Sequence, residues 1–200
     1  MQEKQKQAPE RQYKIVVLGE AAVGKTSLLY RYVSDSFDEH PASTISASFY
    51  TKKLFKQNNK NQNEVFKLQL WDTAGQEKFA QMSAMYYRNA DIVFVVFAVD
   101  SRQSFDKAIC LINEVKAKSQ QKQLVVLLGN KCDLPNILKE EAELFAGINT
   151  VPLYWVSALS GVGIQDAMDK SVNHVSGYAQ DKKLNNIVAP DKMNFKSGCC

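Results

Sequence analysis

The chain has 200 residues, of which 25 are Lys or Arg and 21 are Asp or Glu, giving a formal net charge of +4. Hydrophobic residues make up 45% and charged residues 23% of the sequence, a balance that excludes a disordered or fibrous protein. Because domains commonly have about 150 residues, we expect one compact domain with short tails.

A membrane span, secretion, N-myristoylation and a nucleic-acid partner are all disfavoured. The longest apolar run, residues 92–99, has eight residues, whereas a membrane-spanning helix needs about 20. The first twelve residues are polar and lack the apolar stretch of a secretory signal, and Gln2 in place of glycine excludes N-myristoylation. The net charge is small and dispersed, so no nucleic-acid partner is expected.

The four cysteines do not form a disulfide framework. Cys110 and Cys132 stand alone in apolar surroundings, and Cys199 and Cys200 are the last two residues. This spacing also fits no zinc site. A reducing cytosolic compartment is therefore expected.

Short apolar runs alternate with stretches of helical spacing along the chain. The runs predict six strands, at residues 15–18, 46–55, 64–71, 92–99, 124–128 and 153–156. Helical spacing predicts amphipathic helices at residues 27–33, 105–115 and 164–175. Apolar runs without alternation indicate parallel strands that helices bury on both faces.

Two of the predicted strands, residues 46–55 and 64–71, are joined through the polar insert FKQNNKNQNE without a helix between them, so they should pair as an antiparallel hairpin. The sequence therefore predicts an α/β domain with a six-stranded, mostly parallel sheet, one antiparallel edge strand and helices on both faces. We place this domain at residues 13–180, between a disordered tail at residues 1–12 and a flexible, variable tail at residues 181–200.

The octapeptide GEAAVGKT, Gly19–Thr26, follows the first predicted strand and opens the first predicted helix. The pattern GxxxxGK[ST] between a strand and a helix is typical of a P-loop, whose backbone N–H groups and helix N-terminus face phosphates. We expect Lys25 to reach the outer phosphates and the Thr26 hydroxyl to ligate Mg²⁺. A turn with an incidental lysine is the alternative, which the flanking strand and helix disfavour.

The tetrapeptide NKCD, Asn130–Asp133, follows the predicted strand at residues 124–128, at the edge of the sheet where ligands bind in such folds. A carboxylate at Asp133 can accept hydrogen bonds from both N1–H and the 2-amino group of guanine, whereas adenine presents an acceptor at N1. This complementarity predicts selectivity for guanine nucleotides. Outside this context, an ordinary turn would be the simpler interpretation.

A third segment, WDTAGQE at residues 71–77, ends a predicted strand. Asp72 is placed to hold a Mg²⁺-bound water, Gly75 offers an N–H group to the terminal phosphate, and Gln76 can orient the attacking water as the catalytic residue. Upstream, Thr44 could supply a second Mg²⁺ ligand, although a loop that contains Ser and Thr needs no such role.

These motifs, followed by VSA at residues 156–158, stand in the order and spacing of the small Ras-like GTPases, which the chain resembles. The segments KLQLWDTAGQEKF and MYYRNAD resemble the Rab branch, and STISASF and AMYY lean toward the endosomal Rabs. The resemblance implies the P-loop GTPase fold. It also implies a Mg²⁺-dependent switch that binds GTP and GDP, hydrolyses GTP slowly without an activating protein, and regulates vesicle traffic.

The resemblance further implies roles for individual residues. Phe37 matches the aromatic residue that packs on the guanine, and the N–H of Ala158 matches the group that reads the guanine carbonyl oxygen. Residues 38–49 and 73–88 match the two switch segments. The residues predicted to bind the nucleotide are Ala22, Val23, Gly24, Lys25, Thr26, Ser27, Phe37, Thr44, Gly75, Asn130, Lys131, Asp133, Ser157, Ala158 and Leu159. The predicted Mg²⁺ ligands are Thr26, Thr44 and Asp72, and the predicted effector-binding residues are Phe49, Trp71 and Tyr86.

Cys199 and Cys200 match the Rab site of double prenylation, although an idle redox pair is also compatible with two adjacent cysteines. Two lipid chains give stable anchoring where one chain binds reversibly. By resemblance, the partners are a guanine nucleotide exchange factor, a GTPase-activating protein, a dissociation inhibitor or escort protein, and effectors. We expect a monomer on the cytoplasmic face of an intracellular, endosomal membrane, with a cytosolic pool.

Three positions depart from the family pattern. Ser46 stands where Gly is usual, Leu159 stands where Lys is usual, and Ala21 places a methyl group close to Gln76. These departures leave open a scaffold that holds nucleotide without cycling. A soluble GTPase of the nuclear-transport or signalling kind is a second alternative, which the terminal cysteines oppose.

Overall fold

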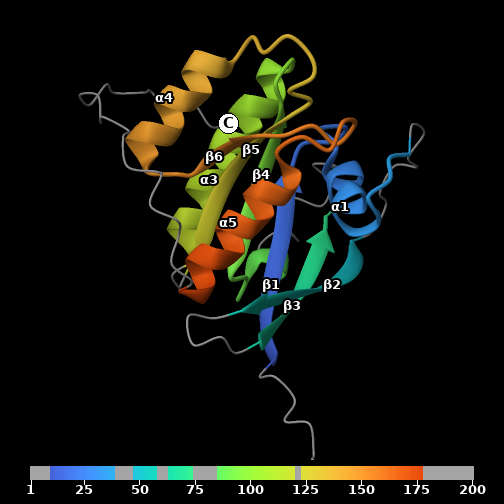
Figure 1. Ribbon diagram of the computed structural model, residues 1–200. Coiled ribbons are helices and arrows are strands. Elements are labelled where there is room, and N and C mark those ends of the chain that lie inside the picture. The colour runs from blue at the N-terminus through green and yellow to red at the C-terminus, as the bar shows by residue number, and fades with distance from the viewer. Residues whose placement is uncertain (1–9, 39–46, 58–62, 74–84, 120–122, 178–200) are drawn as a thin grey trace, which may run out of the picture.

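The computed structural model describes residues 10–38, 47–57, 63–73, 85–119 and 123–177 (Figure 1). The strands are β1 (Glu10–Gly19), β2 (Ser48–Gln57), β3 (Asn63–Asp72), β4 (Ile92–Ala98), β5 (Leu124–Asn130) and β6 (Leu153–Trp155). The helices are α1 (Lys25–Ser34), α3 (Arg102–Lys118), α4 (Lys139–Asn149) and α5 (Ile164–Ser176).

The strands form one six-stranded sheet in the order β2-β3-β1-β4-β5-β6. β2 and β3 pair antiparallel, with Phe49 opposite Trp71, whereas the other neighbouring strands are parallel. This topology confirms the mostly parallel sheet with one antiparallel edge strand that the sequence predicts. Only residues 58–62 separate β2 from β3, too few for the crossover that parallel neighbours need, so the two strands pair antiparallel.

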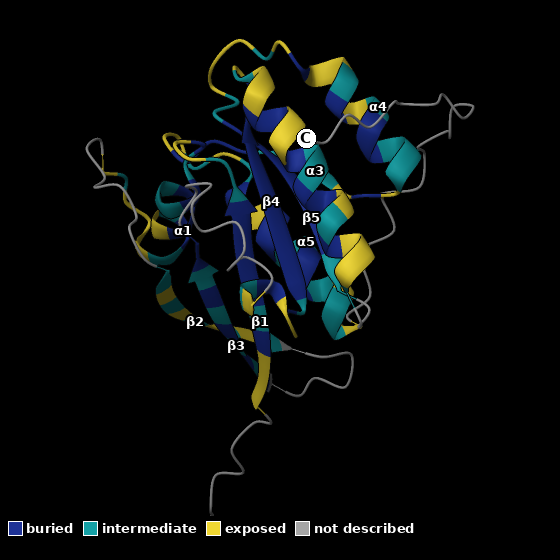
Figure 2. Cartoon of the chain, turned by 180° about the vertical axis from the view of Figure 1, so that it is seen from behind, coloured by how far each residue is buried: buried dark blue, intermediate teal, exposed yellow. Residues whose placement is uncertain are grey.

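Helices cover both faces of the sheet because consecutive strand residues point in opposite directions. Ile15 and Val17 of β1 belong to a core cluster with residues of α1 and α5, whereas Val16 and Leu18 belong to a second cluster with residues of α3 and α4. All seven residues of β4 are buried, and this strand is dark blue along its length in Figure 2. The unbroken apolar runs thus fill two cores at once, and the predicted helices on both faces are confirmed.

β1 begins at Glu10, three residues before the predicted start of the domain. Residues 10–12 pair in parallel with residues 65–67 of β3, and Lys53 Nζ lies 3.3 Å from Glu10 Oε2. The side chains of residues 10–12 are polar and exposed, which is typical of a disordered tail, although their backbone extends the sheet. The prediction of a disordered segment there needs this correction, while residues 1–9 and 178–200 lie outside the described residues.

α4 is a helix that the sequence interpretation did not single out. Ala142, Phe145 and Ala146 are its buried residues, and the Phe145 ring lies 6.2 Å from the Phe105 ring of α3. Asn136 Oδ1 accepts a 3.0 Å hydrogen bond from the N–H of Leu138 just before the helix begins. The apolar side has helical spacing, but two small alanines make that signal weak.

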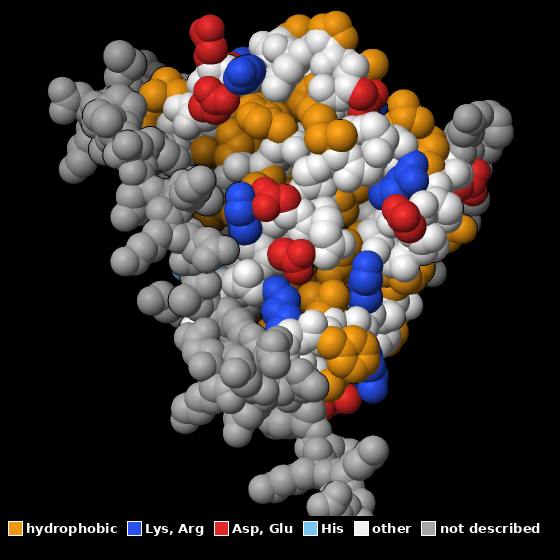
Figure 3. Space-filling model, viewed as in Figure 1, with side chains coloured by type: hydrophobic (Ala, Val, Ile, Leu, Met, Phe, Trp, Pro, Cys, Tyr) orange, Lys and Arg blue, Asp and Glu red, His pale blue; other side chains and the backbone are white. Residues whose placement is uncertain are grey.

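No helix of the described residues is long and apolar enough to cross a membrane. On the face shown in Figure 3, Lys and Arg side chains lie among Asp and Glu side chains rather than in a single basic stripe. Lys170 Nζ, for example, lies 2.9 Å from Asp166 Oδ2 on α5. Exposed pairs of this kind contribute little to stability, so the charges on this face mainly keep it solvated.

Candidate nucleotide-binding site

The loop between β1 and α1 requires glycine at two positions. Gly24, which precedes α1, has a φ of +91°, and a Cβ atom there would lie 2.4 Å from Asn130 Nδ2. A Cβ atom at Gly19 would lie 2.3 Å from the carbonyl oxygen of Val96. Ala22 also has a positive φ, of 62°. The two glycines therefore let the predicted P-loop fold directly against β4 and β5.

The start of α1 is complementary to an anion. No side chain caps this helix, and a helix N-terminus presents backbone N–H groups and partial positive charge to an anion. The Lys25 side chain is nearby and only 5% exposed, and its Nζ donates to the carbonyls of Gly19 at 3.1 Å and Glu20 at 2.6 Å. Burial lowers the pKa of Lys25 to about 8, although the charges of Asp72 and Glu20 oppose this shift. A phosphate would offset the cost of burying this cation.

Thr26 and Asp72 meet beside this helix start. Thr26 Oγ1 donates a 2.6 Å hydrogen bond to Asp72 Oδ2, whereas Asp72 Oδ1 is buried and has no hydrogen-bond partner within the described residues. Burial raises the pKa of Asp72, and the bond from Thr26 and the charge of Lys25 act in the opposite direction. β3 positions the carboxylate, since Asp72 is its last residue.

The oxygens of Thr26 and Asp72 fit Mg²⁺. This ion prefers oxygen ligands and is commonly held by one or two carboxylates together with phosphate oxygens and waters. The unpartnered Asp72 Oδ1 is the observation that favours such a cation. The described part of the chain contains no group of three or more His, Cys, Asp or Glu side chains that could hold a metal by themselves. The remaining ligands would therefore have to come from elsewhere.

Asn130 at the end of β5 ties the P-loop to a second loop. Its side chain is 1% exposed; Nδ2 donates to the carbonyl of Val23 at 2.7 Å, and Oδ1 accepts from the N–H of Ala158 at 3.1 Å. One amide thus fixes two loops that are far apart in the sequence. The predicted reader, the N–H of Ala158, is already engaged here and would share its hydrogen bond with an arriving base.

Asp133 is held by the same second loop. Ser157 Oγ donates to Asp133 Oδ1 at 2.5 Å and also accepts from the N–H of Ser160 at 3.1 Å. Asp133 is exposed, as is Leu159 with 52% of its surface accessible. A carboxylate that has one oxygen anchored and stands at the surface is available to accept hydrogen bonds from a ligand.

Most of the predicted nucleotide-binding residues come together in this way. Phe37 is placed by a different set of contacts. Its half-buried ring packs against the core cluster formed with residues of α1 and α5 (the α1–α5 cluster), and the guanidinium of Arg31 lies 5.9 Å from the ring centroid. Arg31 was not predicted from the sequence, because an arginine on an amphipathic helix reads as surface charge. The predicted site residues that lie outside the described residues are Thr44, Gly75, Gln76, Cys199 and Cys200.

The three predicted effector-binding residues form one aromatic cluster. The ring centroids of Phe49 on β2 and Trp71 on β3 are 5.1 Å apart, and those of Trp71 and Tyr86 are 6.4 Å apart. Phe49 is 51% exposed, and Trp71 Nε1 is buried without a hydrogen-bond partner within the described residues. An exposed aromatic ring backed by further aromatic side chains is typical of a surface that receives a partner.

The chain was compared with known proteins. The Ras family matches residues 14–177. Ras-related protein Rab-18 of Lymnaea stagnalis is 39% identical over 165 residues, which cover 81% of this chain and 79% of that protein. Ras-related protein RabC of Dictyostelium discoideum is 31% identical over 193 residues, covering 94% and 97%. GTP-binding protein ypt5 of Schizosaccharomyces pombe is 36% identical over 157 residues, covering 76% and 72%.

The sheet topology, the P-loop and the paired loops at the ends of β5 and β6 define a P-loop GTPase. The chain belongs to the Ras family, in which its relatives are Rab proteins, and it is a Rab-like small GTPase. It therefore binds guanine nucleotide and hydrolyses GTP. The predicted family, fold and activity are confirmed, whereas the roles of individual residues stay predictions.

Proposed function

We propose that the chain is a membrane-anchored switch of the endosomal Rab branch, which recruits effectors to vesicle membranes while GTP is bound. The segments STISASF and AMYY support the endosomal branch through their resemblance to it. In such a switch the rate of GTP hydrolysis sets how long effectors stay bound, because hydrolysis releases segments that the γ-phosphate had ordered.

In this proposal, different residues of the phosphate half of the site bind the phosphates, hold Mg²⁺ and orient the attacking water. Lys25 and the first turn of α1 bind the outer phosphates, while Thr26 and Asp72, together with Thr44, hold Mg²⁺ directly or through water. When bound, Mg²⁺ supplies positive charge beside the β- and γ-phosphates. Gly75 donates its N–H to the γ-phosphate, and Gln76 orients the water that attacks it.

The base half of the site selects guanine. Asp133 accepts from N1–H and the 2-amino group, and the loop at residues 157–159 donates N–H groups to the carbonyl oxygen. Asn130 supports both halves, because it joins Val23 of the P-loop to Ala158 of the guanine loop. Lys131 and Phe37 complete the base site by resemblance.

The observation that carries the switch is the adjacency of Trp71 and Asp72 in β3. Consecutive strand residues point to opposite faces, so Asp72 meets Thr26 while Trp71 joins Phe49 and Tyr86. The nucleotide site and the aromatic cluster are thus one residue apart on a rigid strand. A displacement of Asp72 would therefore be transmitted directly to Trp71 in the aromatic cluster proposed to bind effectors.

The same proposal covers the chain ends and the partners. A GTPase domain at residues 13–180, extended by the strand at residues 10–12, would stand off the membrane on the tail at residues 181–200. Prenylation of Cys199 and Cys200 would supply two lipid chains, enough for stable anchoring. An exchange factor, an activating protein and an escort protein would set the nucleotide state and the cytosolic pool.

Trp71 offers a direct test, because Trp155 is the other tryptophan of the chain. In Trp155→Phe, the emission of Trp71 should change when a non-hydrolysable GTP analogue replaces GDP. The matched variant Trp71→Phe, which keeps Trp155, should show a much smaller change. Emission that is the same in both nucleotide states of Trp155→Phe would contradict a switch at the aromatic cluster.

A further inference from the structure

The guanidinium of Arg31 donates to three backbone carbonyls and joins the end of α1 to the loop after β6. Its Nε donates to the carbonyl of Ala158 at 3.0 Å, Nη2 donates to the carbonyl of Leu159 at 2.5 Å, and Nη1 donates to the carbonyl of Asp35 at 3.1 Å. Arg31 lies in the last turn of α1, and Asp35 is the C-cap of that helix. A planar guanidinium holds its donors in a fixed fork, so it can restrain two successive carbonyls in a way that lysine cannot.

The restraint passes through the peptide plane to the guanine-reading side of the loop. In a trans peptide the carbonyl and the following N–H point in opposite directions. While Arg31 holds the Leu159 carbonyl, the N–H of Ser160 on the other side of that peptide donates to Ser157 Oγ at 3.1 Å. Ser157 in turn donates to Asp133 Oδ1 at 2.5 Å. A continuous chain of bonds therefore links Arg31 to the proposed guanine carboxylate.

The same guanidinium lies beside the other proposed base contact. Its centre is 5.9 Å from the ring centroid of Phe37, within the range of a cation–π interaction. The hydrogen bonds to the Ala158 and Leu159 carbonyls both come from this side chain of α1. One side chain thus contacts both elements proposed to enclose the base.

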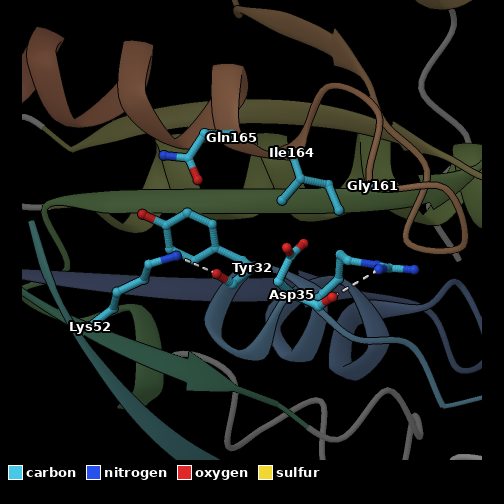
Figure 4. A pocket seen from close by; sticks show the side chains of 7 residues that line it. Tyr32, Asp35, Lys52, Gly161, Ile164 and Gln165 are labelled. Carbon is cyan, nitrogen blue, oxygen red and sulfur yellow. Dashed lines mark hydrogen bonds between the residues drawn. The ribbon is translucent and has the colours of Figure 1, made fainter.

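Lys52, which lines the same pocket as Arg31, is the matched control residue. Arg31 and Lys52 both line a pocket of about 280 Å³ between α1, β2 and the start of α5, where Gly161, Ile164 and Gln165 lie on the far wall (Figure 4). Lys52 Nζ donates to the carbonyl of Tyr32 and lies 3.9 Å from that ring centroid. Lys52 is therefore a basic residue of the same pocket whose hydrogen bond goes to α1 rather than to the guanine loop.

We propose that Arg31 is a positioning residue for guanine recognition. It holds the backbone of residues 158–160, and with it the bonds that anchor Asp133 and the position of the neighbouring N–H groups proposed to meet the carbonyl oxygen of the base. The inference rests on the proposed function in one respect, namely that this loop binds guanine. Arg31 itself touches no reacting atom in this role.

The experiment measures nucleotide dissociation from the full chain in the presence of Mg²⁺. Bound GDP is compared with bound 6-thio-GDP, in which a sulfur atom, a weak acceptor, replaces the carbonyl oxygen while N1–H and the 2-amino group remain. Arg31→Met should release GDP about tenfold faster than the wild type, since it loses hydrogen bonds made by a charged donor. It should release 6-thio-GDP only about threefold faster, because that ligand already gains little from the loop.

The control variants separate positioning from general stability. Lys52→Met should change GDP release by no more than about twofold, and Arg31→Lys should lie between Arg31→Met and the wild type. If Arg31→Met does not fold, Arg31→Lys carries the comparison of the two nucleotides. Release of GDP at the wild-type rate, or equal acceleration for GDP and 6-thio-GDP, would overturn the role of Arg31.

Failure of the proposed function would look different. In that case the wild type itself would release GDP and 6-thio-GDP at the same rate, whatever residue stands at position 31. Tight binding by the wild type together with unchanged release from the Arg31 variants would reject this inference alone.

Discussion

Thr26 Oγ1 donates a 2.6 Å hydrogen bond to Asp72 Oδ2 and thereby joins the start of α1 to the end of β3. The other oxygen of the Asp72 carboxylate is buried without a partner in the described structure. Leaving a buried carboxylate oxygen unpaired is costly, so this oxygen favours the proposed cation site. The proposed Mg²⁺ site, the phosphate site and the aromatic cluster all adjoin this one contact.

Asp72→Asn should weaken the effect of Mg²⁺ on GDP release. The asparagine carbonyl can still accept from Thr26, so the fold should persist, but the negative charge at the proposed metal site is lost. Because changes around metal sites commonly cost 10- to 100-fold in affinity, we expect Mg²⁺ to slow GDP release at least about tenfold less than in the wild type. Asp169→Asn, on the surface of α5, is the control and should behave like the wild type. An unchanged response to Mg²⁺ would remove Asp72 from the metal site.

Gly24→Ala should impair nucleotide binding more than a comparable glycine substitution elsewhere. The new Cβ would lie 2.4 Å from Asn130 Nδ2, the amide that joins the P-loop to the guanine loop. Gly177→Ala shares the strain of a positive φ, here +74°, but has nothing within 4 Å of its Cβ. The control should lower stability by about 1 kcal/mol and leave GDP release unchanged. Thermal unfolding and GDP release measure the two effects, and equal GDP release from both variants would contradict the account.

GDP affinity should decrease as the pH rises from 7 to 9. In the free protein the pKa of Lys25 is lowered to about 8, whereas bound phosphates raise it, so binding takes up a proton at high pH. The protonated fraction of a group with this pKa falls about tenfold between pH 7 and pH 9. Comparison with Lys25→Met isolates this titration from that of the base. The advantage of the wild type over Lys25→Met should fall about tenfold across this range, and a constant advantage would argue against Lys25 as the phosphate ligand.

Asp133→Asn should exchange guanine for xanthine. An asparagine amide accepts from N1–H of xanthine and donates to its 2-oxo group, whereas it leaves the 2-amino group of guanine without an acceptor. Dissociation of GDP and of xanthosine diphosphate measures the change, which should reverse the order of the two affinities. Ser157→Ala is the control: it removes the hydroxyl that anchors Asp133 and should weaken GDP without altering the preference. Retention of guanine preference by Asp133→Asn would place the base reader elsewhere.

Much of the fold could be predicted because buried parallel strands produce unbroken apolar runs. β4, with all seven residues buried, is the clearest example. β1 was predicted to begin too late, since residues 10–12 extend the sheet through backbone pairing with residues 65–67 although their side chains are polar and exposed. α4 was not predicted, because small alanines make up much of its buried side and give a weak hydrophobic pattern.

The site residues likewise fall into those that local sequence motifs predict and those that depend on tertiary contacts. The P-loop and NKCD are local motifs, so Lys25 and Asp133 could be assigned from neighbours in the sequence. Arg31 could not, because the carbonyl of Ala158 that it binds is 127 positions away and carries no sequence signal at all. The packing of Phe37 against the α1–α5 cluster likewise depends on tertiary contacts.

The most direct test of the switch follows Trp71 emission during a single turnover of GTP bound to Trp155→Phe at saturating Mg²⁺. The emission should return to its GDP level at the same rate as phosphate is released, and adding Gln76→Leu should slow both rates together. Emission that stays constant, or that changes at a rate unrelated to phosphate release, would contradict the coupling of hydrolysis to the effector surface.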